Sequence, residues 1–119
     1  MEVQIFGVKK SADTRKAQRF FSERRIKTHF VDLAEKPMSE GELQRFVQRF
    51  GLDQLIDRDS KQFDELGLRH ANPSQARWIE KLMLEPLLMK LPLVRRLGQP
   101  PDLTIGADET RWKTWLSKP

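Results

Sequence analysis

The first third of the chain alternates between strand-like and helix-like hydrophobic patterns. Residues 3–6 are apolar at alternate positions and stop at Gly7, which predicts a short strand. A helical repeat follows, with one face made of Ala17, Phe20, Phe21 and Arg24. Residues 28–33, with Phe30 and Val31 as their apolar centre, predict a second strand. Because a strand, a helix and a strand in this order form a right-handed crossover, we expect the two strands to be parallel.

The next hydrophobic stripe has a helical period and clear ends. Ser39 followed by Glu42 is a capping box, which marks the N-terminus of a helix. The apolar stripe of this helix consists of Leu43, Phe46, Val47 and Phe50. Gly51 comes directly after the stripe, and we expect it to end the helix as a left-handed cap.

Two short elements and one longer helix are expected between residues 52 and 86. Residues 52–56 predict a turn or short helix, and residues 60–68 predict another, with Phe63 and Leu66 pointing inward. Residues 72–74 start the longer helix, and its buried side is expected to contain Ala76, Ile79, Leu82 and Met83. Pro86 lies late in this pattern, where a proline ends or kinks a helix.

The last third of the chain returns to strands. Residues 92–94 and 103–105 are apolar, and the turn-forming segment 98–102 between them predicts an antiparallel hairpin. A last helix is expected to begin at Ala107 or Asp108. It carries Trp112, Trp115 and Leu116.

This order of elements predicts an α/β fold: β-α-β, then a helical block, then β-β-α. We expect a four-stranded mixed β-sheet flanked by helices, the thioredoxin-like arrangement. The length of 119 residues suits one domain, residues 1–119, in which the helical block, about residues 38–90, is an insertion.

Composition excludes several classes of chemistry. The chain has no cysteine, so it has no disulfide, thiolate metal site or thiol nucleophile. Its two histidines are far apart in the sequence, and they predict no metal cluster. No apolar run approaches the roughly 20 residues that span a bilayer, and the first residues lack the pattern of a secretion signal. We therefore expect a cytoplasmic protein with no membrane partner.

Positive charge is concentrated in one segment. The net charge of the chain is +5, and residues 9–27 contain eight basic residues against two acidic ones, Asp13 and Glu23. Such a segment is typical either of an anion-binding patch or of a solvated helix face. Phe20 and Phe21 are the only aromatic residues in it and lie at core spacing. Direct nucleic-acid binding through base stacking is therefore not favoured.

Four segments of the chain have a recognisable pattern: GVKKSADTRKA at residues 7–17, residues 55–58 with 63–66, residues 85–94, and Ile105-Gly106 with the last helix. These segments resemble arsenate reductase (ArsC) family proteins and the related Spx regulators. Together they extend over essentially the whole chain in the family's order. The family cysteine falls where Ser11 stands, and the second cysteine of the Spx redox switch falls at Thr14. The resemblance implies the thioredoxin-like fold.

The resemblance also implies what is lost. Arsenate reduction in this family starts with a thiolate that attacks arsenic, and thiol exchange follows. The hydroxyl of Ser11 is far less acidic than a thiol and lacks the oxidation steps of sulfur. We therefore expect neither arsenate reduction nor a Ser11–Thr14 redox switch. A serine nucleophile needs an adjacent base, and the spacing brings neither His29 nor His70 to Ser11.

An anion site without redox chemistry remains a candidate. Helix N-termini bind anions through free amides and the helix dipole. The candidate binding residues are Lys10, Ser11, Thr14, Arg15, Arg58 and Pro92. The resemblance implies an oxyanion contact for Arg58 and a cis peptide bond at Pro92, whereas Leu91 stands where the reductases usually carry arginine.

Simpler structural roles are open for the same residues. The simpler role for Ser11 and Thr14 is to cap the start of the helix, where Ser11 or Asp13 is the expected cap. Arg58 is flanked by Asp57 and Asp59 and is a candidate for a surface ion pair. The simpler alternative for Pro92 is an ordinary proline at a strand start.

Three functional hypotheses follow. The first is a non-redox ArsC-like protein that binds a protein or an oxyanion such as phosphate, sulfate or arsenate. The second is an Spx-like regulator that contacts RNA polymerase without a thiol switch. The third is an enzyme that uses the thiol of glutathione, steadied by a hydroxyl near Ser11. No cofactor is expected in the first two.

Overall fold

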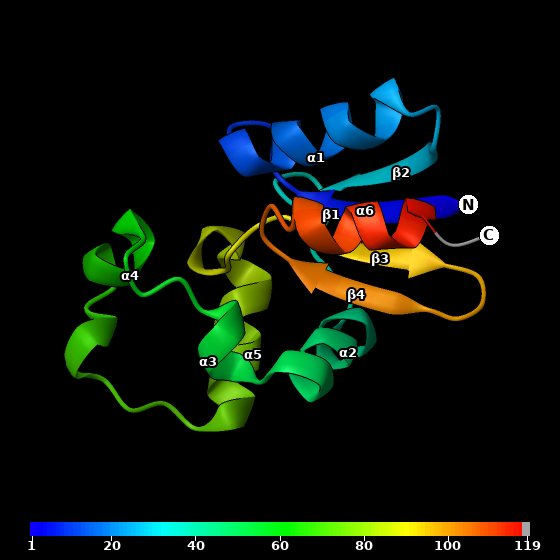
Figure 1. Ribbon diagram of the computed structural model, residues 1–119. Helices are drawn as coiled ribbons and strands as arrows, with labels where there is room; N and C mark the ends of the chain where they lie inside the picture. Colours follow the sequence, from blue (N-terminus) through cyan, green and yellow to red (C-terminus); the bar gives the residue numbers. More distant parts are fainter. Residues whose placement is uncertain (118–119) are drawn as a thin grey trace. The chain divides into compact units, whose positions relative to one another are not determined.

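The computed structural model describes residues 1–117 and contains two compact units. The first combines Met1–Val31 with the chain from Leu91 onward, and the second is Asp32–Lys90. Figure 1 shows the elements of both. The predicted helical block of residues 38–90 falls within the second unit. The assignment of residues 1–119 to one domain stays a prediction.

The first unit contains a four-stranded sheet. Its strands are β1 (Glu2–Gly7), β2 (Lys27–Asp32), β3 (Leu93–Leu97) and β4 (Asp102–Ile105), in the order β2-β1-β3-β4. β3 pairs antiparallel with β1 and with β4, so that Val94 lies between Ile5 and Thr104. β1 and β2 run in the same direction (Figure 1). The predicted mixed sheet and C-terminal hairpin are confirmed.

Two helices pack on this sheet, α1 (Ala12–Glu23) and α6 (Glu109–Ser117). The core between them and the strands consists of Val3, Ile5, Ala17, Phe20, Phe21, Val94, Trp112 and Trp115. The ring of Trp112 lies 5.2 Å from the rings of both Phe20 and Phe21, which joins the helices over the strands. Burying each large aromatic side chain contributes about 2–3 kcal/mol. This packing fixes where α1 begins relative to β1.

Arg24 shares the apolar side of α1, as the helical spacing predicts, but it is not part of the core. Arg24 is the C-cap residue and is exposed, whereas Ala17, Phe20 and Phe21 are buried as predicted. Its guanidinium carbon lies 3.8 Å from the centroid of the Phe20 ring, and Nη1 donates to the Phe20 carbonyl at 3.0 Å. The long aliphatic stem thus lies along the apolar face while the charge stays in water.

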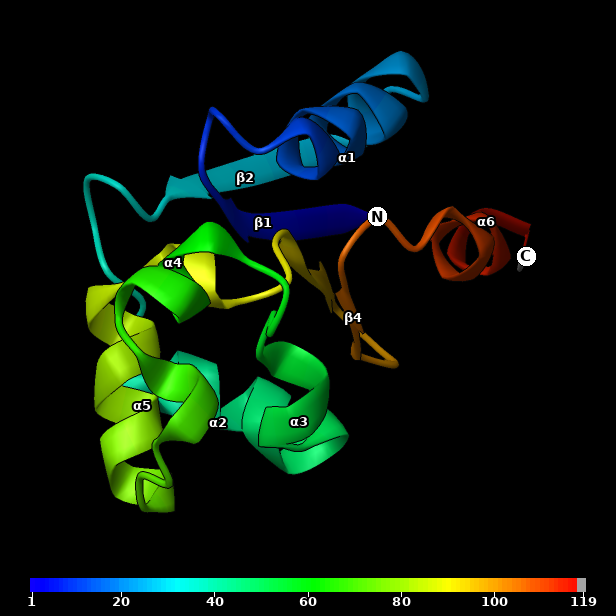
Figure 2. The ribbon, with the colours of Figure 1, turned by 90° about the vertical axis from the view of Figure 1, so that its left-hand side faces the viewer.

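The second unit is helical. It contains α2 (Glu40–Phe50), α3 (Leu52–Leu55), α4 (Lys61–Glu65), η1 (Leu68–His70), α5 (Gln75–Leu84) and η2 (Pro86–Leu88), of which Figure 2 labels the α-helices. Ser39 and Glu42 form the predicted capping box, and Ser74 caps α5. Gly51 ends α2 with φ +83° and ψ 156°, a positive φ but not the predicted left-handed helical conformation.

Two predicted core positions in this unit are also wrong. Leu66 is 48% exposed because α4 ends at Glu65, and Leu68 is buried in its place. Ala76 is exposed because α5 buries the face of Trp78, Ile79 and Leu82. At 100° per residue, Ala76 lies roughly 110° from the centre of that face. Within residues 1–117, no helix is long and apolar enough to cross a membrane.

Candidate functional site at the start of α1

Ser11 is the N-cap of α1, so the choice between Ser11 and Asp13 is settled by the geometry. Its backbone is extended (φ −77°, ψ 120°), and its Oγ accepts a hydrogen bond from the Thr14 amide at 3.1 Å. The Ser11 carbonyl accepts from the Arg15 amide at 3.1 Å. Asp13 lies exposed in the first turn, where its charge is favoured by the helix dipole.

Thr14 occupies a different environment from the one expected of an anion ligand. The residue is fully buried, and its Oγ1 has no hydrogen-bond partner. A Cβ on Gly7 would lie 2.4 Å from this oxygen, so only glycine fits at the end of β1. Oγ1 therefore packs against the backbone of β1. A buried hydroxyl without a partner costs about 1–3 kcal/mol.

Free donors and cations surround the helix start. In the part of the chain that the structure describes, the amides of Ala12 and Asp13 have no acceptor. Lys10 and Arg15 are exposed, and Arg15 Nη1 donates to the Lys9 carbonyl at 2.7 Å. That bond ties Arg15 to the loop before the helix. The helix dipole, the amides and the cations together produce a positive potential at this end of α1.

Pro92 lies at the same end of the sheet as this loop. Phe6 of β1 pairs with Leu93, so one more residue of the same register brings Gly7 level with Pro92. Pro92 is buried, its carbonyl accepts from the Gly106 amide at 2.8 Å, and the Leu91–Pro92 peptide bond is cis. The expected cis bond is confirmed.

Arg58 belongs to the second unit and has an acidic partner there. Its Nη2 lies 3.2 Å from Oδ1 of Asp53, and its guanidinium carbon lies 5.6 Å from the Phe63 ring centroid. An ion pair was one of the two readings of the sequence, but its partner is Asp53 rather than the flanking Asp57 or Asp59. Both side chains are largely exposed, so the pair contributes less than about 1 kcal/mol.

Each histidine has its own surroundings within the unit that contains it. His29 lies in β2, 3.5 Å from a carboxylate oxygen of Glu2, whose pKa is lowered mainly by its hydrogen bond to Lys27. His70 ends η1 rather than lying in a loop, and it is exposed. Within the described residues of the first unit, the Ser11 side chain has the Thr14 amide as its hydrogen-bond partner, and His29 does not contact its hydroxyl.

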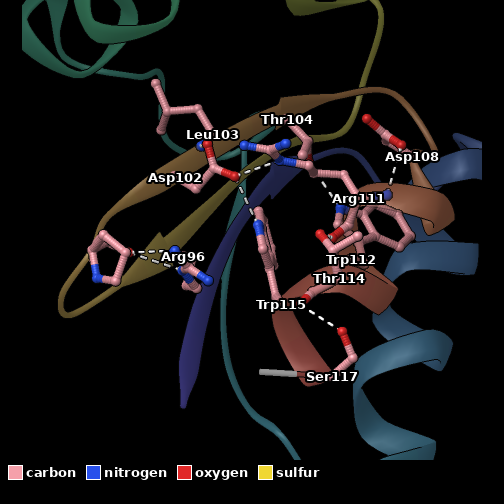
Figure 3. Close-up of polar contacts among 11 residues, drawn as sticks. Arg96, Asp102, Leu103, Thr104, Asp108, Arg111, Trp112, Thr114, Trp115 and Ser117 are labelled. Carbon is pink, nitrogen blue, oxygen red and sulfur yellow. Dashed lines mark hydrogen bonds and ion pairs between the residues drawn. The ribbon is translucent and has the colours of Figure 1, made fainter. Parts of the chain in front are cut away.

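A polar cluster between β4 and α6 escaped the sequence reasoning (Figure 3). The buried Asp102 carboxylate accepts from Arg111 Nε at 2.7 Å and from Trp115 Nε1 at 2.8 Å, and Oδ1 accepts from the Leu103 amide. Burial alone would raise the pKa of Asp102, but these hydrogen bonds lower it to about 2. Trp112 Nε1 donates to Thr104 Oγ1 at 2.9 Å. The cluster anchors α6 to the sheet.

Comparison with known proteins shows which family the chain belongs to. A family model for ArsC matches residues 6–115. The chain belongs to the ArsC family. Its match includes Ser11 and the whole start of α1, so the family membership extends to the candidate site.

Solved structures agree with the ArsC fold. The YffB protein is 21% identical, with a TM-score of 0.83 and coverage of 97% of this chain and 99% of that one. An arsenate reductase (ArsC) related protein from Brucella melitensis is 24% identical, with a TM-score of 0.69 and coverage of 99% and 97%. Arsenate reductase from Vibrio cholerae is 22% identical, with a TM-score of 0.69 and coverage of 84% and 92%.

These likenesses show the fold alone. No curated protein matches the chain significantly. The chain is therefore an ArsC-family protein of thioredoxin-like fold that has no cysteine, with a serine oxygen as the cap of its first helix.

Proposed function

We propose that this ArsC-family protein acts by binding an anionic partner, either a protein or an oxyanion, and performs no thiol redox step. The observation that carries the proposal is the position of Ser11. Its Oγ is the helix cap and is engaged by the Thr14 amide, and His29, the histidine of the same unit, lies against Glu2 instead. A hydroxyl held in this way supports a binding role and no nucleophilic one.

The chemistry of oxygen separates this chain from reductases that use a thiol. A thiolate forms near neutral pH and passes through successive oxidation states of sulfur. A serine hydroxyl forms no such anion without a base, and it has no oxidation states to pass through. With no cysteine anywhere in its 119 residues, this chain supplies no thiol for exchange.

The binding half of the proposal rests on charge. The free amides of Ala12 and Asp13, with Lys10 and Arg15 beside them, favour an anionic group at the helix start. The carboxylate of Asp13 competes for the same field, so the expected affinity for a single small oxyanion is weak. This favours a partner that makes contacts beyond the helix start.

Two measurements test the proposal. Purified protein given arsenate, glutathione and glutaredoxin is expected to show no arsenite formation. Phosphate or arsenate titration is expected to shift the NMR signals of the Ala12 and Asp13 amides and of their neighbours Ser11 and Thr14. Lys10→Gln is expected to weaken these shifts, and Lys36→Gln, which removes an exposed charge from the second unit, is the matched control.

Arsenate turnover would contradict the non-redox half of the proposal. Unmoved helix-start amides at high phosphate would leave Ser11 with its capping role and would remove the oxyanion as a partner. Calorimetry with glutathione and copurification with RNA polymerase test the two narrower alternatives. Heat at millimolar glutathione would favour the glutathione-linked enzyme instead.

A further inference from the structure

A groove of about 510 Å³ lies between α1 and β2, on the flank of the helix rather than at its start. Its lining comes from Arg15, Gln18, Arg19, Ser22, Thr28 and Phe30. The four helical residues follow the i, i+3, i+4, i+7 spacing of one helix face. The two strand residues alternate, so they point to the same face of the sheet. No acidic residue lines the groove.

The arginines of this groove have no acidic partner. Within the described residues of the first unit, no carboxylate oxygen lies within 4.0 Å of Arg15 or Arg19, and Arg19 makes no side-chain hydrogen bond. Other arginines do find carboxylates: Arg58, Arg69 and Arg111 have them at 3.2, 2.7 and 2.7 Å. One Arg15 nitrogen, Nη1, is held by the Lys9 carbonyl at 2.7 Å. The groove therefore offers the remaining N–H groups of Arg15 and the guanidinium of Arg19 to a negative charge that the unit does not supply.

β2 also has an open hydrogen-bonding edge. It is the outermost strand in the order β2-β1-β3-β4, and within the described chain its only neighbour in the sheet is β1. Such an edge is a template for an added strand, because its outward backbone groups are unpaired. In Figure 1 α1 runs alongside β2, so an added strand would lie beside the groove.

The spacing of the arginines matches that of an extended chain. Arg15 and Arg19 are four residues apart, which on a helix is about 6 Å. Side chains at alternate positions of a strand are about 6.6 Å apart and share one face. Two carboxylates at alternate positions of an added strand would therefore meet the two guanidinium groups together. Each contact would be a charge-assisted hydrogen-bond pair.

We propose that the α1–β2 groove binds an extended acidic segment of a protein partner, which adds to the edge of β2 and places alternate carboxylates on Arg15 and Arg19. This inference rests on the proposed binding function and names its surface and partner class. A peptide is favoured over nucleic acid because Phe30 is the one aromatic residue in the lining, which provides no platform for successive bases.

The test uses three synthetic peptides of the same length. The first carries glutamates at alternate positions, as Thr-Glu-Val-Glu-Val-Thr. The second has the same residues with its two glutamates adjacent, and the third has glutamine in place of both. Binding to the full chain is measured by NMR titration and calorimetry at low and moderate salt.

The alternate peptide is expected to bind at least tenfold more tightly than the other two, and more weakly as salt rises. Its binding is expected to shift the amides of Thr28 and Phe30 and to slow their hydrogen exchange. Arg15→Gln or Arg19→Gln is expected to raise its Kd about tenfold, and the double variant about a hundredfold. Lys16→Gln, one residue from Arg15 but outside the lining, is the matched control and is expected to leave the Kd nearly unchanged.

The contrary outcomes separate this inference from the proposed function. Equal binding of the alternate and adjacent peptides, or shifts confined to Ala12 and Asp13, would overturn the groove inference and leave anion binding in place. Tighter binding of oligouridylate to the same residues would overturn the peptide as the partner. If neither peptide nor phosphate moved any amide, both the inference and the anion-binding half of the proposed function would fail.

Discussion

The two helices that pack on the sheet of the first unit differ in how their polar groups are satisfied. At α6, the buried Asp102 carboxylate receives hydrogen bonds from Arg111, Trp115 and Leu103. At α1, the Thr14 hydroxyl is buried without a partner, and Arg19 has no carboxylate within 4.0 Å among the described residues of the first unit. Helix α6 is therefore anchored to the sheet by hydrogen bonds, whereas α1 has hydrogen-bond donors and positive charge that the first unit does not neutralise. This difference is the reason why we assign binding to α1 and stability to α6.

The largest expected effect is a loss of stability when the hydrogen-bonded cluster that anchors α6 is disrupted. Asp102→Ala leaves the Trp115 indole and the Arg111 guanidinium without their acceptor, so we expect a loss of about 3 kcal/mol in the free energy of unfolding. Urea denaturation followed by tryptophan fluorescence measures it. Asp59→Ala, at an exposed position in the second unit, is the control and should change stability by less than about 0.5 kcal/mol. A small effect at Asp102 would show that the cluster does not hold α6.

The second effect concerns the pH dependence of the same cluster. The pKa of Asp102 is about 2 in the folded chain, below the value of about 3.9 typical of unfolded aspartate. Its carboxylate therefore stabilises the fold above pH 4, and about 2 kcal/mol is lost as the pH falls from 4 towards 2. Urea unfolding at several pH values measures how the free energy of unfolding changes with pH. Asp102→Asn should lack the loss of stability between pH 4 and 2. An unchanged loss in this variant would show that Asp102 is not the group that titrates.

A smaller effect is expected at the α1 cap. Ser11→Ala removes the acceptor for the Thr14 amide and should cost about 1 kcal/mol of stability. Ser11→Asp keeps an acceptor at the cap and should recover most of it, while its added negative charge should weaken phosphate binding at the helix start. Thermal unfolding measures the change in stability, and NMR titration measures the change in phosphate binding. An equal loss in both variants would indicate that Ser11 acts through packing instead.

The smallest effect has the opposite sign. Thr14→Val replaces a buried, unpartnered hydroxyl with a methyl group of similar shape, so we expect a gain of about 0.5–1 kcal/mol in stability. Thr14→Ser, which keeps the hydroxyl and loses the methyl group, is the matched comparison and should be destabilising. Loss of stability in Thr14→Val would show that the hydroxyl has a partner, such as a buried water.

The sequence predicted features that depend on neighbours within a few residues. Alternation marked β1, helical spacing marked Ala17, Phe20 and Phe21, and the capping box at Ser39 marked the start of α2. Each is decided by backbone hydrogen bonds and side-chain directions within one or two turns, which the local residue types control. The resemblance at residues 7–17 likewise led to Ser11 and to the ArsC family.

Other features depended on residues distant in the chain. The residues next to Asp102 in the sequence do not predict its hydrogen bond to Trp115. The residues next to Thr14 likewise do not predict that its hydroxyl lies against Gly7 of β1. The exposed Leu66 and the α1–β2 groove have the same origin, because burial depends on which elements meet after folding. The sequence by itself determined the elements, the missing sulfur and the basic helix. Tertiary packing alone decided which polar groups were satisfied, since a hydrogen bond requires both partners to be brought within about 3 Å.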